Sequence, residues 1–192
     1  NSLRAFSDKF TEQEIISSLD ILHKAGKKGY ITVNIYPKDE DFAALKDYLI
    51  FLQSAGADGV IISDIGVVEL CKKYAPALEI HISTQANTLN SHTAKFWQSM
   101  GAKRIILARE LSLIQIAAIR DALDDSTEIE IFVHGAMCIS YSGRCLLSNY
   151  LSGRDSNRGE CVQACRWRYE IREAERGGDF LTLEEDKYGS YI

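Results

Sequence analysis

The chain has 192 residues, of which 46% are hydrophobic and 26% charged, and its formal net charge at pH 7 is −5. This balance is typical of an ordinary globular protein with one sizeable core, and it carries no global charge signature for nucleic acid. No run of about 18 apolar residues occurs, and no basic segment precedes an apolar one at the N-terminus. The sequence therefore predicts no signal peptide and no membrane partner, and we expect a cytoplasmic protein.

The first 135 residues alternate β-branched runs with amphipathic segments, the pattern of βα units around a parallel sheet. Strands are expected at residues 30–36, 59–63, 79–84, 104–108 and 128–134, because each is dense in Ile and Val. Helices are expected at about 11–27, 39–55, 67–74, 91–99 and 112–123, the first beginning with a Thr11–Glu14 capping box. Five glycines between a helix and the next strand are expected to be left-handed caps: Gly26, Gly29, Gly56, Gly59 and Gly101.

A segment rich in Gly, Ser, Asn and Arg follows residue 135 and ends near residue 167, before a further strand expected at 168–172. We divide the chain into a βα region (1–135), an insertion (136–167) and the start of the next strand and connection (168–192). The insertion leaves the carboxyl end of the fifth strand, where α/β proteins gather functional loops. Other polar residues expected at this end are Asn34, Asp64, Thr84, Gln85, Asn87, Arg109, Glu110 and His134, although each alone also suits a cap or turn.

Four of the five cysteines, Cys138, Cys145, Cys161 and Cys165, lie within 28 residues of the insertion, while Cys71 stands apart. An odd cysteine count without a secretory signal argues against a disulfide framework. The spacing C-x6-C-x15-C-x3-C lacks the C-x2-C pairs of structural zinc sites, so an iron–sulfur cluster is favoured over zinc. Free thiols or disulfides remain the alternatives.

Arginines are concentrated around these cysteines. Between residues 138 and 169 there are five arginines, among them Arg154, Arg158 and Arg166, against two acidic residues. They are candidates for contacts with an anionic partner, or they offset thiolate and cluster charge. Four aromatic residues interleave with them, Tyr141, Tyr150, Trp167 and Tyr169, and either stack on bases or anchor the loop.

The segments EIFVHGAMCISYSGRCLLS and GRDSNRGECVQACRW resemble the signature of the collagenase-like peptidase family, whose catalytic type is unassigned. The N-terminal SLRAF and the runs TVNIY, HISTQANTLN and LARELSL extend the resemblance over the whole chain. It implies a (β/α) TIM-barrel-like parallel sheet, and family members continue beyond both ends of this sequence. We therefore expect an internal fragment with an incomplete barrel, whose unpaired sheet edges favour a homo-oligomer.

Relatives in this family take part in prephenate-dependent tRNA hydroxylation, rRNA cytidine hydroxylation and ubiquinone hydroxylation. The GRDSNRGECVQACRW run resembles the RNA-modifying branch more closely. The resemblance implies a four-iron four-sulfur cluster, which aerobic purification can destroy, on Cys138, Cys145, Cys161 and Cys165, with RNA and a small anionic donor as partners. We also expect an electron-transfer protein as a partner.

Roles for the other site residues follow from position. Glu110 and His134 are candidates for proton handling, and Gln85, Asn87 and Arg109 are candidates for binding substrate.

Peptidase chemistry is the alternative that the family name suggests. Neither H-E-x-x-H nor G-x-S-x-G occurs, so only the nearby pair of Cys138 and His134 offers a nucleophile and base. A non-catalytic, cluster-bearing partner protein is a third interpretation.

Overall fold

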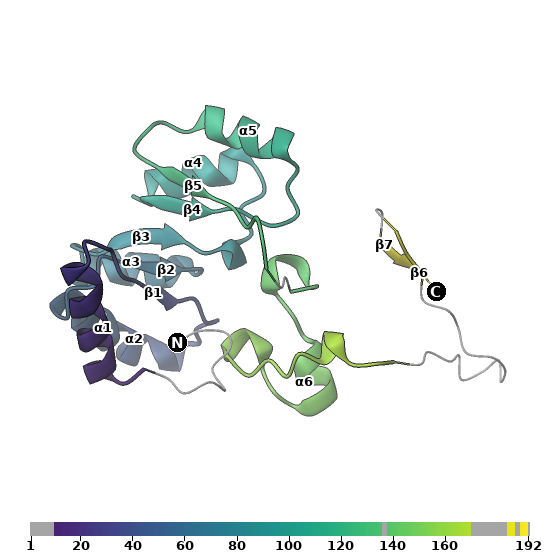
Figure 1. The fold of residues 1–192 in the computed structure, drawn as a ribbon, viewed down its shortest axis with the longest axis horizontal. Helices are drawn as coiled ribbons and strands as arrows, with labels where there is room; N and C mark the ends of the chain where they lie inside the picture. Colours follow the sequence, from purple (N-terminus) through teal and green to yellow (C-terminus); the bar gives the residue numbers. More distant parts are fainter. Residues whose placement is uncertain (1–9, 136–137, 170–183, 187–188, 192) are drawn as a thin grey trace. The chain divides into compact units, whose positions relative to one another are not determined.

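The computed structural model describes residues 10–135, 138–169, 184–186 and 189–191 (Figure 1). The chain divides into two compact units, Asn1–Val162 and Gln163–Ile192, and each is described by itself. No helix among the described residues is both long and apolar enough to cross a bilayer.

The first unit contains a five-stranded parallel sheet in the order β1-β2-β3-β4-β5. Its strands are β1 (Tyr30–Val33), β2 (Gly59–Ile62), β3 (Glu79–Ile82), β4 (Arg104–Ile106) and β5 (Glu128–Glu130). Helices α1 (Glu12–Lys24), α2 (Phe42–Ser54), α3 (Ile65–Tyr74), α4 (Ser91–Ser99) and α5 (Leu113–Ala122) alternate with them, and α6 (Leu147–Ser152) follows. The predicted α/β class and open parallel sheet are confirmed.

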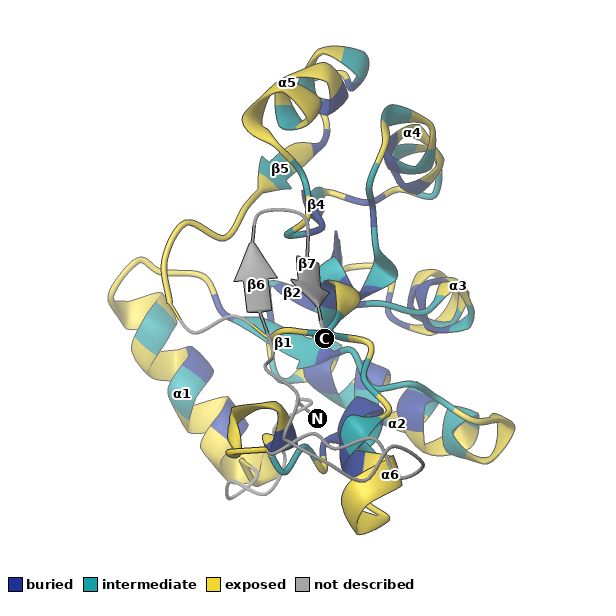
Figure 2. Cartoon of the chain, turned by 90° about the vertical axis from the view of Figure 1, so that its right-hand side faces the viewer, coloured by how far each residue is buried: buried dark blue, intermediate teal, exposed yellow. Residues whose placement is uncertain are grey.

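The core lies between one face of the sheet and the helices. Alternate strand residues bury apolar side chains there, including Val33, Val60, Ile62, Ile82 and Ile105, against Leu49, Leu52, Val67, Val68 and Ile119 of the helices. Figure 2 shows the buried helix residues on the sides that face the sheet. Each such side chain contributes roughly 1.5–3 kcal/mol through burial, so this layer is what holds the sheet together.

The opposite face of the sheet carries charged and aromatic side chains together with Ile61 and Ile106. Arg104 on β4 forms ion pairs with Glu128 and Glu130 on β5, at 2.5 and 3.4 Å. His81 on β3 is buried against the Tyr30 ring, with 4.3 Å between ring centroids. Burial lowers the pKa of His81, although the adjacent Glu79 carboxylate opposes that shift.

Side-chain caps fix where several helices begin. The predicted capping box at α1 is confirmed, with the Thr11 hydroxyl accepting from Glu14 N–H and Glu14 accepting from Thr11 N–H. Gly26, Gly56 and Gly101 have the expected positive φ. The same prediction is wrong for Gly29 and Gly59, which do not have a positive φ. A Cβ on Gly29 would lie 2.4 Å from the Leu19 side chain, and one on Gly59 would lie 2.5 Å from the Glu79 carbonyl oxygen. Close packing, rather than a left-handed turn, requires glycine at those two positions.

The strands end earlier than predicted, and β4 and β5 do so although the residues that follow them, 107–108 and 131–133, are still apolar. The N–H of Leu107, beyond the end of β4, still donates to the Glu130 carbonyl at 2.9 Å. In the sheet, β1 and β5 each pair with one neighbour, and the residues after β5 are exposed, with Phe132 at 53% and Val133 at 85%. The oligomer expected from these edges stays a prediction.

The second unit holds a turn at Ala164–Arg166 and an antiparallel hairpin of β6 (Glu184–Asp186) and β7 (Gly189–Tyr191), which the sequence did not predict. The rings of Trp167 and Tyr169 stack with centroids 6.5 Å apart. Residues 168 and 169 are not in a strand, and the rest of the strand expected at 168–172 lies outside the described residues.

Candidate functional site

The carboxyl ends of the strands form one connected polar region. The Ser63 hydroxyl donates to the Asn34 carbonyl at 3.2 Å, and Thr84 donates to the Leu107 carbonyl at 3.0 Å. Asp64 caps α3 by accepting from Val67 N–H at 3.1 Å. Asp64 and Thr84 therefore have clear structural uses at this end of the sheet.

Residues 138–162, here called the cysteine segment, fold back onto these strand ends. The turn Tyr141–Gly143 contacts the turn Thr84–Ala86 that follows β3. Figure 1 shows the turn of the cysteine segment beside the carboxyl end of β3. The prediction that the insertion would serve this end of the sheet thus agrees with the structure.

Two consecutive residues after β4 hold the first part of the cysteine segment. The guanidinium of Arg109 donates to the carbonyls of Cys138 and Ser140, at 2.8 and 2.9 Å. Glu110 accepts from the N–H of Ser142 at 2.7 Å with one carboxylate oxygen and from its hydroxyl at 2.8 Å with the other. Both side chains that were candidates for substrate or proton contacts are thus engaged in holding the loop.

Ser142 is the centre of this attachment. It is fully buried and has a φ of 44°, a left-handed conformation that costs free energy for a residue with a Cβ. Its hydroxyl also lies 2.7 Å from Asn87 Oδ1, and because a hydroxyl has one proton, only one of its two acceptors receives it at a time. The bonds that Ser142 donates to Glu110 and Asn87 offset the strain at Ser142.

The electrostatics of this loop favour anionic side chains. Burial would raise the pKa of Glu110, but the bonds from Ser142 outweigh it and hold that pKa below its usual range. Burial likewise opposes ionisation of Cys138, yet its contact with the Ser140 hydroxyl at 2.9 Å and the nearby Arg109 charge lower the pKa of this thiol. Cys138 is therefore the described thiol best prepared to act as a thiolate.

Arg144 and Arg158 attach the segment to other strand ends. Arg144 donates to the Gln85 carbonyl at 3.2 and 3.3 Å and lies over the Tyr36 ring, 5.4 Å from its centroid. Arg158 donates to the Tyr36 carbonyl and to both Asp41 carboxylate oxygens, at 2.7 and 3.0 Å. This bidentate pair holds the pKa of Asp41 far below its usual range.

The sulfur atoms of three cysteines have hydrogen-bonding groups beside them. Leu147 N–H donates to Cys145 Sγ at 3.3 Å, and the Ser148 hydroxyl lies 4.0 Å from Cys161 Sγ, while Ser140 adjoins Cys138. Donors to sulfur are typical of thiolates that ligate iron or zinc, so the chemistry of this donor set fits a metal group. Within the described residues no three ligating side chains are gathered to hold a metal, and Cys165 belongs to the second unit.

Three of the remaining predicted site residues, His134, Arg154 and Arg166, lie at the surface, whereas Gln85 is buried. His134 is exposed at the end of the segment after β5, and no hydrogen bond joins its described side chain to Cys138. Arg154 and, in the second unit, Arg166 are exposed. Gln85 is buried, with 3% exposure, and its side-chain oxygen meets no donor among the described residues; the same holds for the side-chain oxygen of Asn34 after β1.

Sequence reasoning missed the residues that attach the cysteine segment from within: Ser142, Arg144, Ser148 and Asn157. Their pattern, S-G-R and D-S-N-R-G, predicted turns but gave no sign that these side chains would be buried or would bond to the backbone. The only usable signal was the density of small polar residues around the cysteines.

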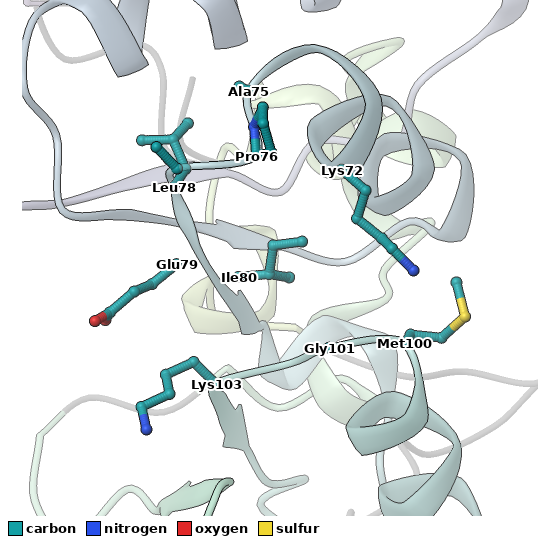
Figure 3. Close-up of a pocket in the computed structure, with 10 residues that line it drawn as sticks. Lys72, Ala75, Pro76, Leu78, Glu79, Ile80, Met100, Gly101 and Lys103 are labelled. Atoms are coloured by element: carbon teal, nitrogen blue, oxygen red, sulfur yellow. The ribbon is translucent and has the colours of Figure 1, made fainter.

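A pocket of about 440 Å³ lies at the opposite, amino end of the sheet. Its lining includes Lys72, Glu79, Met100 and Lys103, which Figure 3 shows around the opening. The Lys103 ammonium donates to the Ser126 carbonyl and Glu79 pairs with Lys28, so the charged groups serve neighbouring loops. In (β/α) folds this end contributes to stability rather than to chemistry.

Comparison with known proteins gives the chain a family. Residues 1–192 match the family model described as Peptidase family U32. A tRNA hydroxylation protein of Bacillus subtilis is 43% identical over 96% of this chain and 43% of its own length. A 23S rRNA 5-hydroxycytidine synthase of Escherichia coli is 38% identical, over 84% and 24%, and a collagenase of Porphyromonas gingivalis is 32% identical, over 100% and 47%. The chain spans about half the length of such relatives, or less.

The solved structure of a U32 peptidase matches with a TM-score of 0.55 at 19% identity, over 65% of this chain and 53% of that chain. A likeness at this identity concerns the fold alone. It agrees with the parallel α/β arrangement of the first unit.

Proposed function

This chain belongs to peptidase family U32, and we propose that it acts in RNA hydroxylation, with tRNA as the substrate. Two relatives support the proposal by their names, a tRNA hydroxylation protein and an rRNA hydroxycytidine synthase. The observation that carries it is the attachment of the cysteine segment to the strand ends through Arg109 and Glu110, because (β/α) proteins do their chemistry at this end. A cytoplasmic location follows from an RNA substrate.

The proposal includes a four-iron four-sulfur cluster held by Cys138, Cys145, Cys161 and Cys165. When bound, such a cluster would supply one-electron redox chemistry. The donors beside Cys138, Cys145 and Cys161 support it, since hydrogen bonds to sulfur stabilise thiolate ligands. Zinc on the same thiolates is the alternative metal, and metal analysis separates the two.

The RNA and a small carboxylate donor such as prephenate would approach from the exposed side of the cysteine segment. Tyr141 and Tyr150 are 53% and 86% exposed there, and aromatic rings of this kind stack on unpaired bases. Arg154 and Arg166 are exposed cations suited to phosphate. Arg109 and Arg158 already bind carbonyls and a carboxylate, so in this function they support the loop.

The experiment measures hydroxylated nucleosides in cellular RNA by mass spectrometry after replacing Cys138 or Cys145 with Ala in the encoded protein. The expected result is loss of the modified nucleoside in both variants. Cys71→Ala is the matched control, because this buried thiol in α3 has a pKa raised by burial to about 11 and lies outside the insertion. Unchanged nucleosides in the Cys138 and Cys145 variants would overturn the proposal. If the proposal is right, anaerobic analysis of the wild-type protein should also find about four iron and four sulfide ions per chain.

Peptidase activity is the second candidate, favoured by the lowered pKa of Cys138 and by the collagenase among the relatives. Among the described residues no hydrogen bond joins His134 to this thiol, so the structure gives the nucleophile no paired base. Peptide cleavage that survives iron chelation and is lost in Cys138→Ser would establish it. A cluster-bearing protein without turnover, the third candidate, predicts iron and sulfide but unchanged nucleosides.

A further inference from the structure

Asn157 is a buried polar residue between the second and third cysteines of the segment. Its side chain is 7% exposed, and it lies in the turn Ser156–Arg158. A buried primary amide costs free energy unless its oxygen and its nitrogen are both hydrogen-bonded. The partners of this amide therefore indicate what the residue does.

Both groups of the amide bond to the same residue, Cys145. The Oδ1 of Asn157 accepts from Cys145 N–H at 3.1 Å, and its Nδ2 donates to the Cys145 carbonyl at 2.9 Å. The hydroxyl of Ser156 donates to that carbonyl as well, at 2.6 Å. Among side chains of this length only asparagine both accepts and donates in one plane, so it can hold the peptide groups on the two sides of one Cα.

The backbone of Asn157 is itself attached to Tyr36, in the loop that follows β1. Its carbonyl accepts from Tyr36 N–H at 3.1 Å, and the next residue, Arg158, donates to the Tyr36 carbonyl at 2.8 Å. Asn157 thus links the backbone of Cys145 to the loop that follows β1. With both of its peptide groups held and Leu147 N–H directed at the sulfur at 3.3 Å, the direction of the Cys145 side chain is constrained.

We infer that Asn157 is the positioning residue for the Cys145 thiolate, fixing it for the metal group proposed above. The inference rests on the proposed function for the identity of that group, but the hydrogen bonds to Cys145 stand without it. Asn157 touches neither substrate nor sulfur and acts only through the Cys145 backbone.

The test compares Asn157→Asp with Asn149→Asp in the metal-free protein. The first exchange keeps the shape of the side chain but replaces the donor to the Cys145 carbonyl by an oxygen. The second adds the same charge at an exposed position of α6. Iodoacetamide alkylation is followed at Cys145 and Cys138 by mass spectrometry, and the ratio of the two rates cancels global effects. We expect Asn157→Asp to raise this ratio about tenfold, and Asn149→Asp to leave it unchanged.

Ser156→Ala provides a second variant should Asn157→Asp fold poorly, because it removes only the hydroxyl that donates to the same carbonyl. It should raise the ratio by a smaller factor. Equal ratios in the wild type and both variants would overturn the inference.

Reconstitution with iron and sulfide gives the second readout. We expect the Asn157→Asp protein to lose iron to a chelator faster than the wild type and to show an altered paramagnetic resonance spectrum on reduction. Unchanged iron retention despite a raised alkylation ratio would also overturn the inference. A wild-type protein that never takes up iron, with a raised ratio in the variant, would instead overturn the proposed cluster and leave the constraint on Cys145 intact.

Discussion

The sheet with its helices and the cysteine segment belong to one compact unit but are held by different interactions. Between the sheet and its helices the buried side chains are mainly Ile, Leu and Val. In residues 138–162 the buried side chains are polar: Ser142, Ser148, Ser156 and Asn157. Apolar burial is non-directional, whereas the polar side chains here bond to particular backbone or side-chain groups.

This difference has a consequence for how the two regions respond to mutation. Loss of apolar volume lowers the stability of the whole unit, because its layers share one core. Loss of a single side-chain bond to the cysteine segment should release a few residues of loop while the sheet stays folded. The comparison is therefore open to test by substitutions on each side.

The largest effect is expected for Leu49→Ala in α2, whose side chain is fully buried. Removing it leaves a cavity in the layer between helix and sheet, and the free energy of unfolding should fall by about 2–5 kcal/mol. Ile50→Ala in the same helix is the matched control, since Ile50 is 39% exposed and should cost far less. Equal losses in urea unfolding of the two variants would contradict the assignment of the core.

Glu110→Gln comes next, and its effect should be local. Glutamine keeps an acceptor for the Ser142 N–H, and its amide can donate to the Ser142 hydroxyl, whose proton then goes to Asn87. The change therefore replaces charge-assisted bonds by neutral ones and weakens this partly buried attachment by about 1–2 kcal/mol. Hydrogen exchange at the Ser142 amide should accelerate about tenfold, while amides of β2 and β3 keep their protection.

The control for that experiment is Glu69→Gln, which alters an exposed side chain 3.8 Å from Lys72. A surface pair of this kind contributes little, so exchange at Ser142 should not change. If Glu110→Gln instead speeds exchange throughout the sheet, the cysteine segment and the sheet unfold as one cooperative unit. The two regions then do not respond to mutation independently.

The two regions also differ in what their sequences reveal. The sequence correctly predicts the strands that contain Ile31, Val33, Val60 and Ile62. Apolar residues in a periodic pattern have one stable arrangement, a sheet covered by helices. The attachment of Ser142 by Glu110, 32 positions away, leaves no periodicity. Sequence reasoning identified Glu110 and Arg109 as site residues from their place at a strand end, but not that they bind the loop. Direct contacts between distant polar groups are visible only in the folded chain.

Arg109→Gln tests the electrostatics of the loop and should shift the titration of Cys138. The pKa of this thiol is lowered in part by the Arg109 charge, so Cys138 ionises at lower pH than an ordinary cysteine. Removing the cation should raise the pKa, and the midpoint of the pH profile for iodoacetamide alkylation should move to higher pH. Using the midpoint rather than the rate separates the lost charge from loosening of the loop.

Arg144→Gln is the control for this shift. Arg144 lies in the same loop as Cys138, but its guanidinium donates to the Gln85 carbonyl after β3. Its Cys138 profile should match the wild type. An unchanged midpoint in Arg109→Gln would show that the Ser140 contact alone lowers the pKa.

The smallest effect is expected for Arg158→Gln, which breaks a partly exposed pair with Asp41. Because the pKa of Asp41 is lowered on folding, mainly by the hydrogen bond from Arg158, the ionised carboxylate stabilises the folded chain above its unfolded pKa of about 4. That stabilisation is lost as the pH falls toward the lower folded value. The gap between wild type and Arg158→Gln in urea unfolding should be constant from pH 5 to 7 and shrink below about pH 4.

Lys24→Gln is the matched control for this ion pair, because Lys24 and Asp20 are 75% and 58% exposed on α1 and solvent screens their attraction. It should leave unfolding unchanged at every pH. A gap for Arg158→Gln that persists at low pH would mean that its bond to the Tyr36 carbonyl, which does not titrate, carries the effect. In that case the cysteine segment would be held here as it is at Cys145, by bonds to the backbone rather than by charge.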